Sequence, residues 1–400
     1  MTRQCNTDMV DRRQFCRTAA TAGLAISLFG RAGLGRAQSV QLPQQSTEPP
    51  KKPSTNGQDA LAYPRIGVSL PGKYPSRVGQ VTHEKAVVNN APDPAAVETM
   101  VARALLSLTG ASSIKTAWRE FVTPEDIVGL KVNPVAGALL STSPEVVSVI
   151  IRQLIESGIP RDHIVIWDRR EFELADAGFT QERFPGIRLV GTERKDTAGS
   201  FTDAEGKLLS EAMIDRGWFY WADVEEKYDA ETLPYMVNEG KHSYFTRIVT
   251  QDVTKIINLP ILKNAGATVT LCLKNLAYGA ITNTGRLHKQ LWAETCAEVP
   301  AFPPLRDKVV LNIVDGIKGC YNGGPGANPQ FFTNYNTILA GTDPVAVDRI
   351  GYEIVLKKRL EEKVQKEESP RGRAFLTLAE QMGLGTADLG KITLEHERLS

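Results

Sequence analysis

The chain has 400 residues, of which 42% are hydrophobic and 23% are charged, and its formal net charge is +1. These proportions are ordinary for a soluble globular protein, and the length allows two or three domains. A chain this close to neutral is poorly suited to nucleic acid as its main partner, because phosphate contacts require a basic surface.

The first 37 residues predict a twin-arginine signal peptide, because a basic region precedes a short, mildly apolar run and a small-residue exit, GRAQS. Arg12 and Arg13 are the paired arginines, and Phe15 follows them. We therefore expect export by the twin-arginine machinery to the periplasm or the cell exterior. The apolar run is too short to span a bilayer comfortably, so no stable membrane span is expected after cleavage. A short amphipathic helix is the alternative interpretation.

Residues 38–62 are rich in Gln, Pro, Ser and Lys, and they carry no apolar period. This composition predicts a disordered linker. The remainder, 63–400, shows neither an internal repeat nor a second linker, which favours one large domain.

Within that domain, short apolar segments rich in Val and Ile predict strands that are buried on both faces, as in a parallel sheet. In chain order they are residues 65–70, 126–133, 163–168, 187–192, 255–260, 308–315 and 336–341.

Helical patterns alternate with these strands. The first covers residues 93–108. In the segment SPEVVSVIIRQLIESG, Ser143 is the expected N-cap and Pro144 the first helical residue. A further helix follows Thr342 or Asp343 as its cap. The alternation predicts an α/β fold in which helices cover both faces of a mostly parallel sheet within a single large domain.

Polar side chains stand at the carboxyl ends of four predicted strands, where open α/β sheets bind their ligands. They are Lys131, Asn133, Asp168, Asn258, Lys263 and Asp315. Any one of them could be an ordinary solvent-facing residue, but the set favours a binding site. The candidates for binding a small anion, a carboxylate or a phosphate, are Lys131, Asn133, Lys263, Lys274 and Asn275.

The segment LKNAGATVTLCLKN contains the dipeptide Lys-Asn twice, at Lys263 and at Lys274. Two ammonium groups around a run of core character are costly unless an anion meets them. One interpretation makes Thr268 the cap of a helix whose N-terminus would attract that anion. The strict alternation of TVTLCLK supports a strand instead, and the pattern leaves both structures open.

Asp168, Asp315 and His288 are the candidate catalytic residues. Asp168, Asp315 and Asp348 are the candidate ligands of a divalent cation such as Mg, Ca or Mn. The histidines have no metal-binding spacing, and no Cys-x-x-Cys is present, so this chain carries no iron–sulfur motif and its cofactor is unassigned. Buried, unreacted thiols are expected at cysteines 272, 296 and 320.

The glycine-rich stretch YNGGPGANP, residues 321–329, lacks the Gly-Lys-Ser/Thr ending of a phosphate-binding loop. A turn is the favoured interpretation. Close approach of its backbone to a ligand is the alternative.

Taken in order, the segments LKVNP, SPEVVSVIIRQLIESG with VIWD, INLPILK with TVTLCLKNLAYG, LNIVDGI with GGPG, and ILAGTDPVAVD resemble the domain-of-unknown-function family 362 over about residues 66–389. The family is uncharacterised, so the resemblance implies a fold and a site position but no reaction. Some relatives carry ferredoxin-like iron–sulfur modules, which this sequence does not contain. Relatives usually show Lys-x-His after the INLP strand, whereas here Lys263 is kept and Ala265 stands in the place of the histidine, so a role of that histidine would either be absent or pass to His288.

Two hypotheses follow. The first is an exported enzyme that acts on a small anionic substrate, with or without a divalent metal. The second is a non-catalytic anion-binding protein, or a redox accessory that serves another exported protein. The same lysines serve both, but only the enzyme requires acid–base groups, and the sequence leans weakly toward the enzyme.

Overall fold

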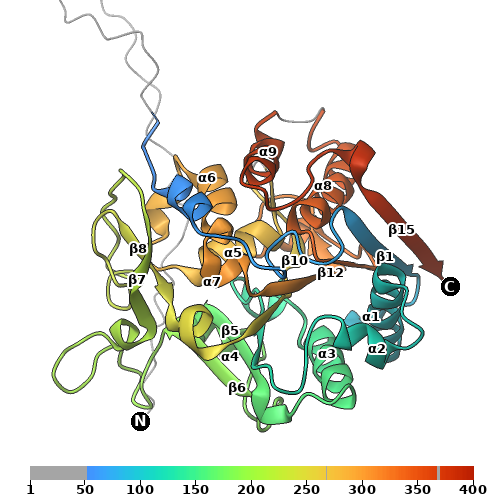
Figure 1. Cartoon of the computed structure of the whole chain (residues 1–400), viewed down its shortest axis with the longest axis horizontal. Coiled ribbons are helices and arrows are strands. Elements are labelled where there is room, and N and C mark those ends of the chain that lie inside the picture. Colours follow the sequence, from blue (N-terminus) through green and yellow to red (C-terminus); the bar gives the residue numbers. More distant parts are fainter. Residues whose placement is uncertain (1–51, 267, 367–369) are drawn as a thin grey trace, which may run out of the picture. The chain divides into compact units, whose positions relative to one another are not determined.

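The computed structural model describes residues 52–266, 268–366 and 370–400, and a sheet of 11 strands forms its centre (Figure 1). Five neighbouring strands run parallel in the spatial order β12, β9, β4, β5, β6. Their bounds are Val309–Cys320, Lys255–Asn258, Val128–Lys131, Ile164–Arg170 and Arg188–Glu193. This arrangement confirms the predicted α/β fold with a mostly parallel sheet.

Beyond β12 the sheet continues with β14 (Thr337–Gly341), β1 (Arg77–His83) and, at the edge, β15 (Thr393–Leu399). β14 is antiparallel to both of its neighbours. β10 (Ile261–Ala265) pairs with the second half of β12 and forms a hairpin with β11 (Thr268–Thr270). The remaining strands are β2 (Val87–Val88), β3 (Ala91–Pro92), β7 (Ile214–Trp221), β8 (His242–Thr246) and β13 (Phe332–Thr333).

Helices cover both faces of the sheet, because successive strand residues point to opposite sides and both sides are apolar. In β5, Ile164 and Ile166 pack with α1 and α3, whereas Val165 and Trp167 pack in the core that includes α5, α6, α8 and α9. The helices are α1 (Pro94–Thr109), α2 (Ile114–Arg119), α3 (Pro144–Glu156), α4 (Glu171–Asp176), α5 (Cys272–Ala280), α6 (Trp292–Glu298), α7 (Pro303–Arg306), α8 (Pro344–Glu361) and α9 (Ala374–Gln381).

The predicted caps of α3 and α8 are present. Ser143 Oγ accepts a hydrogen bond from the backbone N–H of Glu145. Asp343 is the cap of α8, and its carboxylate accepts from the N–H groups of Val345 and Ala346. Local sequence signals therefore positioned the starts of both helices correctly.

Residues 65–70 do not form the predicted strand. They form a turn, in which the backbone N–H of Ile66 donates to Ser69 Oγ and that of Leu70 donates to the carbonyl of Arg306. The sequence analysis also missed β1 and β15. Most of β15 is exposed and its sequence is TLEHERL, so it lacks the apolar run by which a buried strand is recognised.

The folded unit begins at Lys52, so it starts earlier than the predicted boundary at residue 63. Gly57–Ala62 forms a short helix in which Ala60 is fully buried. The buried guanidinium of Arg306 donates to the carbonyls of Ala60 and Tyr63. Hydrogen bonds from the Arg306 side chain and the burial of Ala60 in the core hold this segment, and composition does not reveal either contact. The predicted signal peptide lies outside the described residues.

In the part of the chain that the structure describes, no helix has both the length and the apolar character needed to cross a membrane. Cys272, Cys296 and Cys320 are buried free thiols, as expected.

The segment LKNAGATVTLCLKN, for which the sequence pattern allowed either a helix or a strand, contains both. Thr268–Thr270 is a strand, and α5 begins two residues later at Cys272. The N-terminus of α5 is occupied by Asp348 of α8, whose carboxylate accepts hydrogen bonds from the N–H groups of Cys272 at 2.7 Å and Leu273 at 3.0 Å. Asp348 is therefore a buried cap for this helix and not the metal ligand that we predicted.

Asp348 should make stability depend on pH, because complete burial raises the pKa of its carboxyl to about 7. An unfolded aspartate titrates near pH ~4, so the folded state binds this proton more tightly. The stability that the proton contributes is present below about pH 4 and is lost as the pH rises through about 7. Between these values, acidification should stabilise the wild type relative to Asp348→Asn by up to about 1.4 kcal/mol per pH unit, measured by urea denaturation.

The exposed Asp176→Asn at the end of α4 is the matched control, and its denaturation curves should follow those of the wild type at each pH. Parallel pH profiles for the wild type and Asp348→Asn would show that the carboxyl does not titrate in this range.

Candidate functional site

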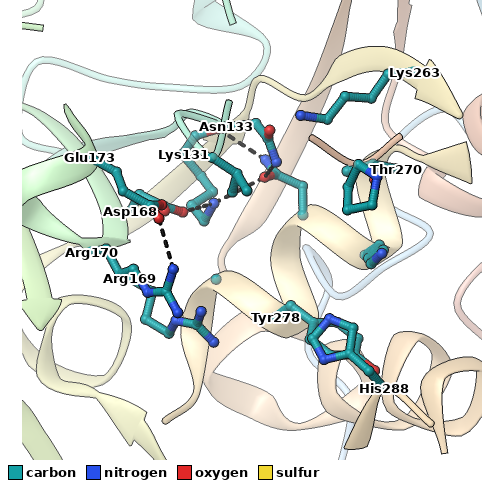
Figure 2. A pocket seen from close by; sticks show the side chains of 15 residues that line it. Lys131, Asn133, Asp168, Arg169, Arg170, Glu173, Lys263, Thr270, Tyr278 and His288 are labelled. Atoms are coloured by element: carbon teal, nitrogen blue, oxygen red, sulfur yellow. Dashed lines mark hydrogen bonds and ion pairs between the residues drawn. The ribbon is translucent and has the colours of Figure 1, made fainter. Parts of the chain in front are cut away.

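A pocket of about 210 Å³ opens at the carboxyl ends of β4 and β5, beside β10, β11 and α5 (Figure 2). Seven of the residues singled out from the sequence line it: Lys131, Asn133, Asp168, Lys263, Lys274, Asn275 and His288. Polar residues at the ends of separate strands converge here, as the rule for open α/β sheets predicts.

Lys131 and Asp168 form a buried ion pair between the ends of β4 and β5, with side chains only 1% and 6% exposed. The Lys131 ammonium also donates to the carbonyl of Val132 at 2.7 Å and to Asn275 Oδ1 at 3.0 Å. Burial lowers the pKa of Lys131, and the charge of Asp168 opposes this effect. All three ammonium protons have acceptors, so this lysine is a structural cation.

Four buried asparagines continue this arrangement into the sheet. Asn275 Oδ1 accepts from Asn133 as well as from Lys131, and Asn275 Nδ2 donates to Asn258 Oδ1 at 2.8 Å. Asn258 Nδ2 in turn donates to Asn312 Oδ1 at 2.9 Å. At the other end of this series of hydrogen bonds lies Asn133 Oδ1. This atom is buried, but it accepts no hydrogen bond from any of the described residues.

Lys263 and Lys274 differ from Lys131 in having few partners. Lys263 is fully buried in β10, and among the described residues its ammonium donates only to the carbonyl of Leu140, at 3.3 Å. Lys274, on α5, lies 5.7 Å from the centre of the Tyr278 ring. Within the described residues, no carboxylate or hydrogen-bond acceptor meets its ammonium. Burial lowers the pKa of both lysines, to about 7 for Lys263, where the positive charge of Lys274 adds to the effect.

The sequence analysis missed Arg169 and Arg170, which directly follow Asp168 and also line the pocket. Arg170 is paired with Glu173 at 2.8 Å and with Glu193 at 3.1 Å. Arg169 donates to Thr284 Oγ1. The run Asp-Arg-Arg at the end of a strand was the available signal. With them, five basic side chains and only two carboxylates line the pocket.

His288 lies at the rim of the pocket and is largely exposed. Its ring packs against that of Tyr278 in a tilted arrangement, with 4.3 Å between the ring centroids. Nδ1 lies 3.1 Å from the carbonyl of Thr284, which can only accept, so the neutral ring carries its proton there. Partial burial, followed by the charges of Lys274 and Arg169, lowers the pKa of His288. Nε2 therefore retains its lone pair at neutral pH and can accept a hydrogen bond.

Asp315 lies elsewhere. Its carboxylate accepts hydrogen bonds from the N–H groups of Ser143 and Ile317, and it borders a different hollow, together with Lys318. Burial raises its pKa to about 6. The structure thus separates Asp168, Asp315 and Asp348, and no cluster of three or more His, Cys, Asp or Glu side chains suited to a metal occurs in residues 52–266, 268–366 and 370–400.

The glycine-rich stretch contributes Pro325 to the pocket lining. Gly324 packs so closely on the carbonyl of Asn264 that a Cβ would overlap it. The close approach is therefore to the backbone of β10, and the stretch is a turn that closes one side of the pocket.

The family described as Domain of unknown function (DUF362) matches residues 128–353. No curated protein is significantly similar to the chain. A solved structure of a Thermotoga maritima protein, a target of the Northeast Structural Genomics Consortium, is 9% identical, with a TM-score of 0.36. The alignment covers 68% of this chain and 60% of the Thermotoga maritima chain.

Gly279 on α5 should be required for the Lys131–Asp168 pair, because a Cβ at this position would overlap the end of the Lys131 side chain. We expect Gly279→Ala to lower the free energy of unfolding by about 1–3 kcal/mol through overpacking, despite the better helix propensity of alanine. Denaturant unfolding measures the effect.

The control is Gly326→Ala, since no atom lies within 4 Å of a Cβ built at Gly326. Its unfolding free energy should stay within about 0.5 kcal/mol of the wild type. If both variants are equally stable, Lys131 moves aside freely and the pair does not require the glycine.

Proposed function

The chain belongs to the DUF362 family, which is defined without an activity, and from the pocket itself we propose an exported enzyme that acts on a small anionic substrate, a carboxylate or a phosphate. The observation that carries the proposal is a pair of lysines, the buried Lys263 and the half-buried Lys274, that no carboxylate meets among the described residues.

The cost of desolvating these ammonium groups supports an anion as their partner. A buried charge is tolerated when an opposite charge and hydrogen bonds compensate it. Asp168 is committed to Lys131, and Glu173 to Arg170, so neither compensates Lys274. A bound anion would supply the missing charge, which is why the excess of basic side chains favours this class of ligand.

Groups that can move protons support a reaction over simple capture. The pKa of Lys263 is lowered to about 7, so this amine can change protonation state at physiological pH, whereas His288 presents a neutral imidazole at the rim that can accept a hydrogen bond. In this proposal Asp168 positions Lys131, and the separated aspartates hold backbone N–H groups in place of a metal. A non-catalytic anion-binding or redox-accessory role would use the same lysines but would release its ligand unchanged.

Lys274→Met should weaken anion binding without harming the fold. Because a hydrogen bond to a charged group contributes about 1.5–3 kcal/mol, we expect affinity for inorganic phosphate or pyruvate to fall by about 10- to 100-fold in titration calorimetry. Removing an uncompensated charge should leave the ligand-free variant at least as stable as the wild type. Thermal unfolding should therefore show a stable variant whose Tm no longer rises with added anion.

Lys357→Met is the matched control, because Lys357 lies on α8 with its side chain 80% exposed. It should bind the anion as the wild type does. Equal affinity of Lys274→Met and the wild type would mean that the pocket is not the anion site.

Export should depend on the paired arginines. We expect the double substitution Arg12→Lys and Arg13→Lys to retain the full-length precursor inside the cell, because the twin-arginine route recognises this pair. Immunoblots of cell fractions measure the distribution, and Arg3→Lys, outside the motif, should leave export intact. Unchanged export of the double variant would contradict the proposed route.

A further inference from the structure

Lys263 has the surroundings of an amine that reacts, not of one that only binds. Its side chain extends from β10 into the pocket on the side of Asn133 (Figure 2). It is fully buried, yet with the described residues its ammonium makes a single hydrogen bond of 3.3 Å, whereas Lys131 in the same pocket uses three acceptors. An ammonium held this loosely in a dry site has little to stabilise its charge.

The neighbours of Lys263 favour its neutral form. Leu140, Ile261 and Cys320 form an apolar cluster beside it, and Lys274 adds a positive charge from α5. Three groups oppose these effects: the Cys320 thiol, whose own pKa is raised by burial, and Glu173 and Asp168, which are paired with other cations. Desolvation and a nearby cation are the two means by which proteins make a lysine nucleophilic. At neutral pH a large fraction of Lys263 is therefore free amine.

The rest of the pocket supplies what a covalent step requires. Lys274 can hold the anionic end of a ligand. Two buried oxygens that line the same pocket, Asn133 Oδ1 and Thr270 Oγ1, have no hydrogen-bond partner among the described residues. Asn133 Oδ1 can only accept, so it would receive the hydrogen bond of a hydroxyl or of a protonated imine formed at Lys263.

We propose that Lys263 condenses with the carbonyl carbon of a small 2-oxo acid whose carboxylate is bound by Lys274. The lone pair of the neutral amine forms the new C–N bond, the carbonyl π electrons move to oxygen, and a proton passes from nitrogen to that oxygen. Protonation of the resulting hydroxyl expels water as the C=N bond forms. One amine, one carbonyl and one proton thus give one protonated imine and one water, without a redox partner. This inference rests on the proposed anion site, which positions the carbonyl.

Reductive trapping tests the inference. The folded protein is incubated with pyruvate and sodium cyanoborohydride, which reduces the imine to a stable secondary amine, and peptide mass spectrometry locates the adduct. We expect a single adduct at Lys263, its loss in Lys263→Met, and competition by acetate, which has the carboxylate but no ketone. Lys274→Met should slow trapping by about 10-fold or more, the loss expected for one charged hydrogen bond.

The pH profile separates Lys263 from surface lysines. Trapping at Lys263 should rise between about pH 6 and pH 8 and then level off, because the pKa of this amine is lowered to about 7 by burial and by Lys274. Exposed lysines, which titrate near pH ~10.4, should keep gaining reactivity. Circular dichroism checks that Lys263→Met is folded, and if it is not, the adduct position in the wild type decides alone.

Adducts that occur only on exposed lysines, or none at all, would overturn the inference. If calorimetry shows phosphate binding while pyruvate gives no adduct, the covalent step is wrong and the anion site stands. If neither anion binds and no adduct forms, both proposals fail.

Discussion

The Lys131–Asp168 ion pair is the contact on which the geometry of the pocket depends. One buried ammonium joins the ends of β4 and β5 and reaches Asn275 on α5, so three elements meet at a single charge. A charge held out of water is tolerated only while its hydrogen bonds are complete. The carbonyl of Val132 accepts one of these hydrogen bonds. Gly279 leaves the space that the end of the Lys131 side chain occupies, because a Cβ at this position would overlap it.

The asparagines carry this order across the sheet without further charge. From the pocket, amide hydrogen bonds run through Asn275, Asn258 and Asn312 to the carbonyls of Gly341 and Thr342, where α8 begins. Because amides are neutral, burying them costs far less than burying ions once they are hydrogen-bonded. Among the described residues, these asparagines are hydrogen-bonded throughout except at Asn133 Oδ1, and Asn133 lines the pocket. Lys263 and Lys274 differ from these residues in having few partners, and this difference is why we propose that they bind a ligand.

Family membership and pocket chemistry answer different questions here. The family relates the chain to others but assigns no activity. Two residues after Lys263, at the end of β10, stands the buried Ala265. His288 reaches the pocket from a separate turn after α5 and faces it from the rim. The titratable bases that line the pocket are therefore its lysines and this histidine.

Sequence alone determined the parallel strands, the caps at Ser143 and Asp343, and seven of the residues that line the pocket, because apolar runs and cap residues are local signals and parallel strands end at one edge. Only the tertiary structure decided at which residue each strand ends. Asp315 looked terminal, but β10 pairs with β12 and extends it to Cys320, so Asp315 lies within the strand. In the same way, pairing with β6 carries β5 on to Arg170. Strand ends and the partners of buried carboxylates depend on residues distant in sequence, and no local pattern contains them.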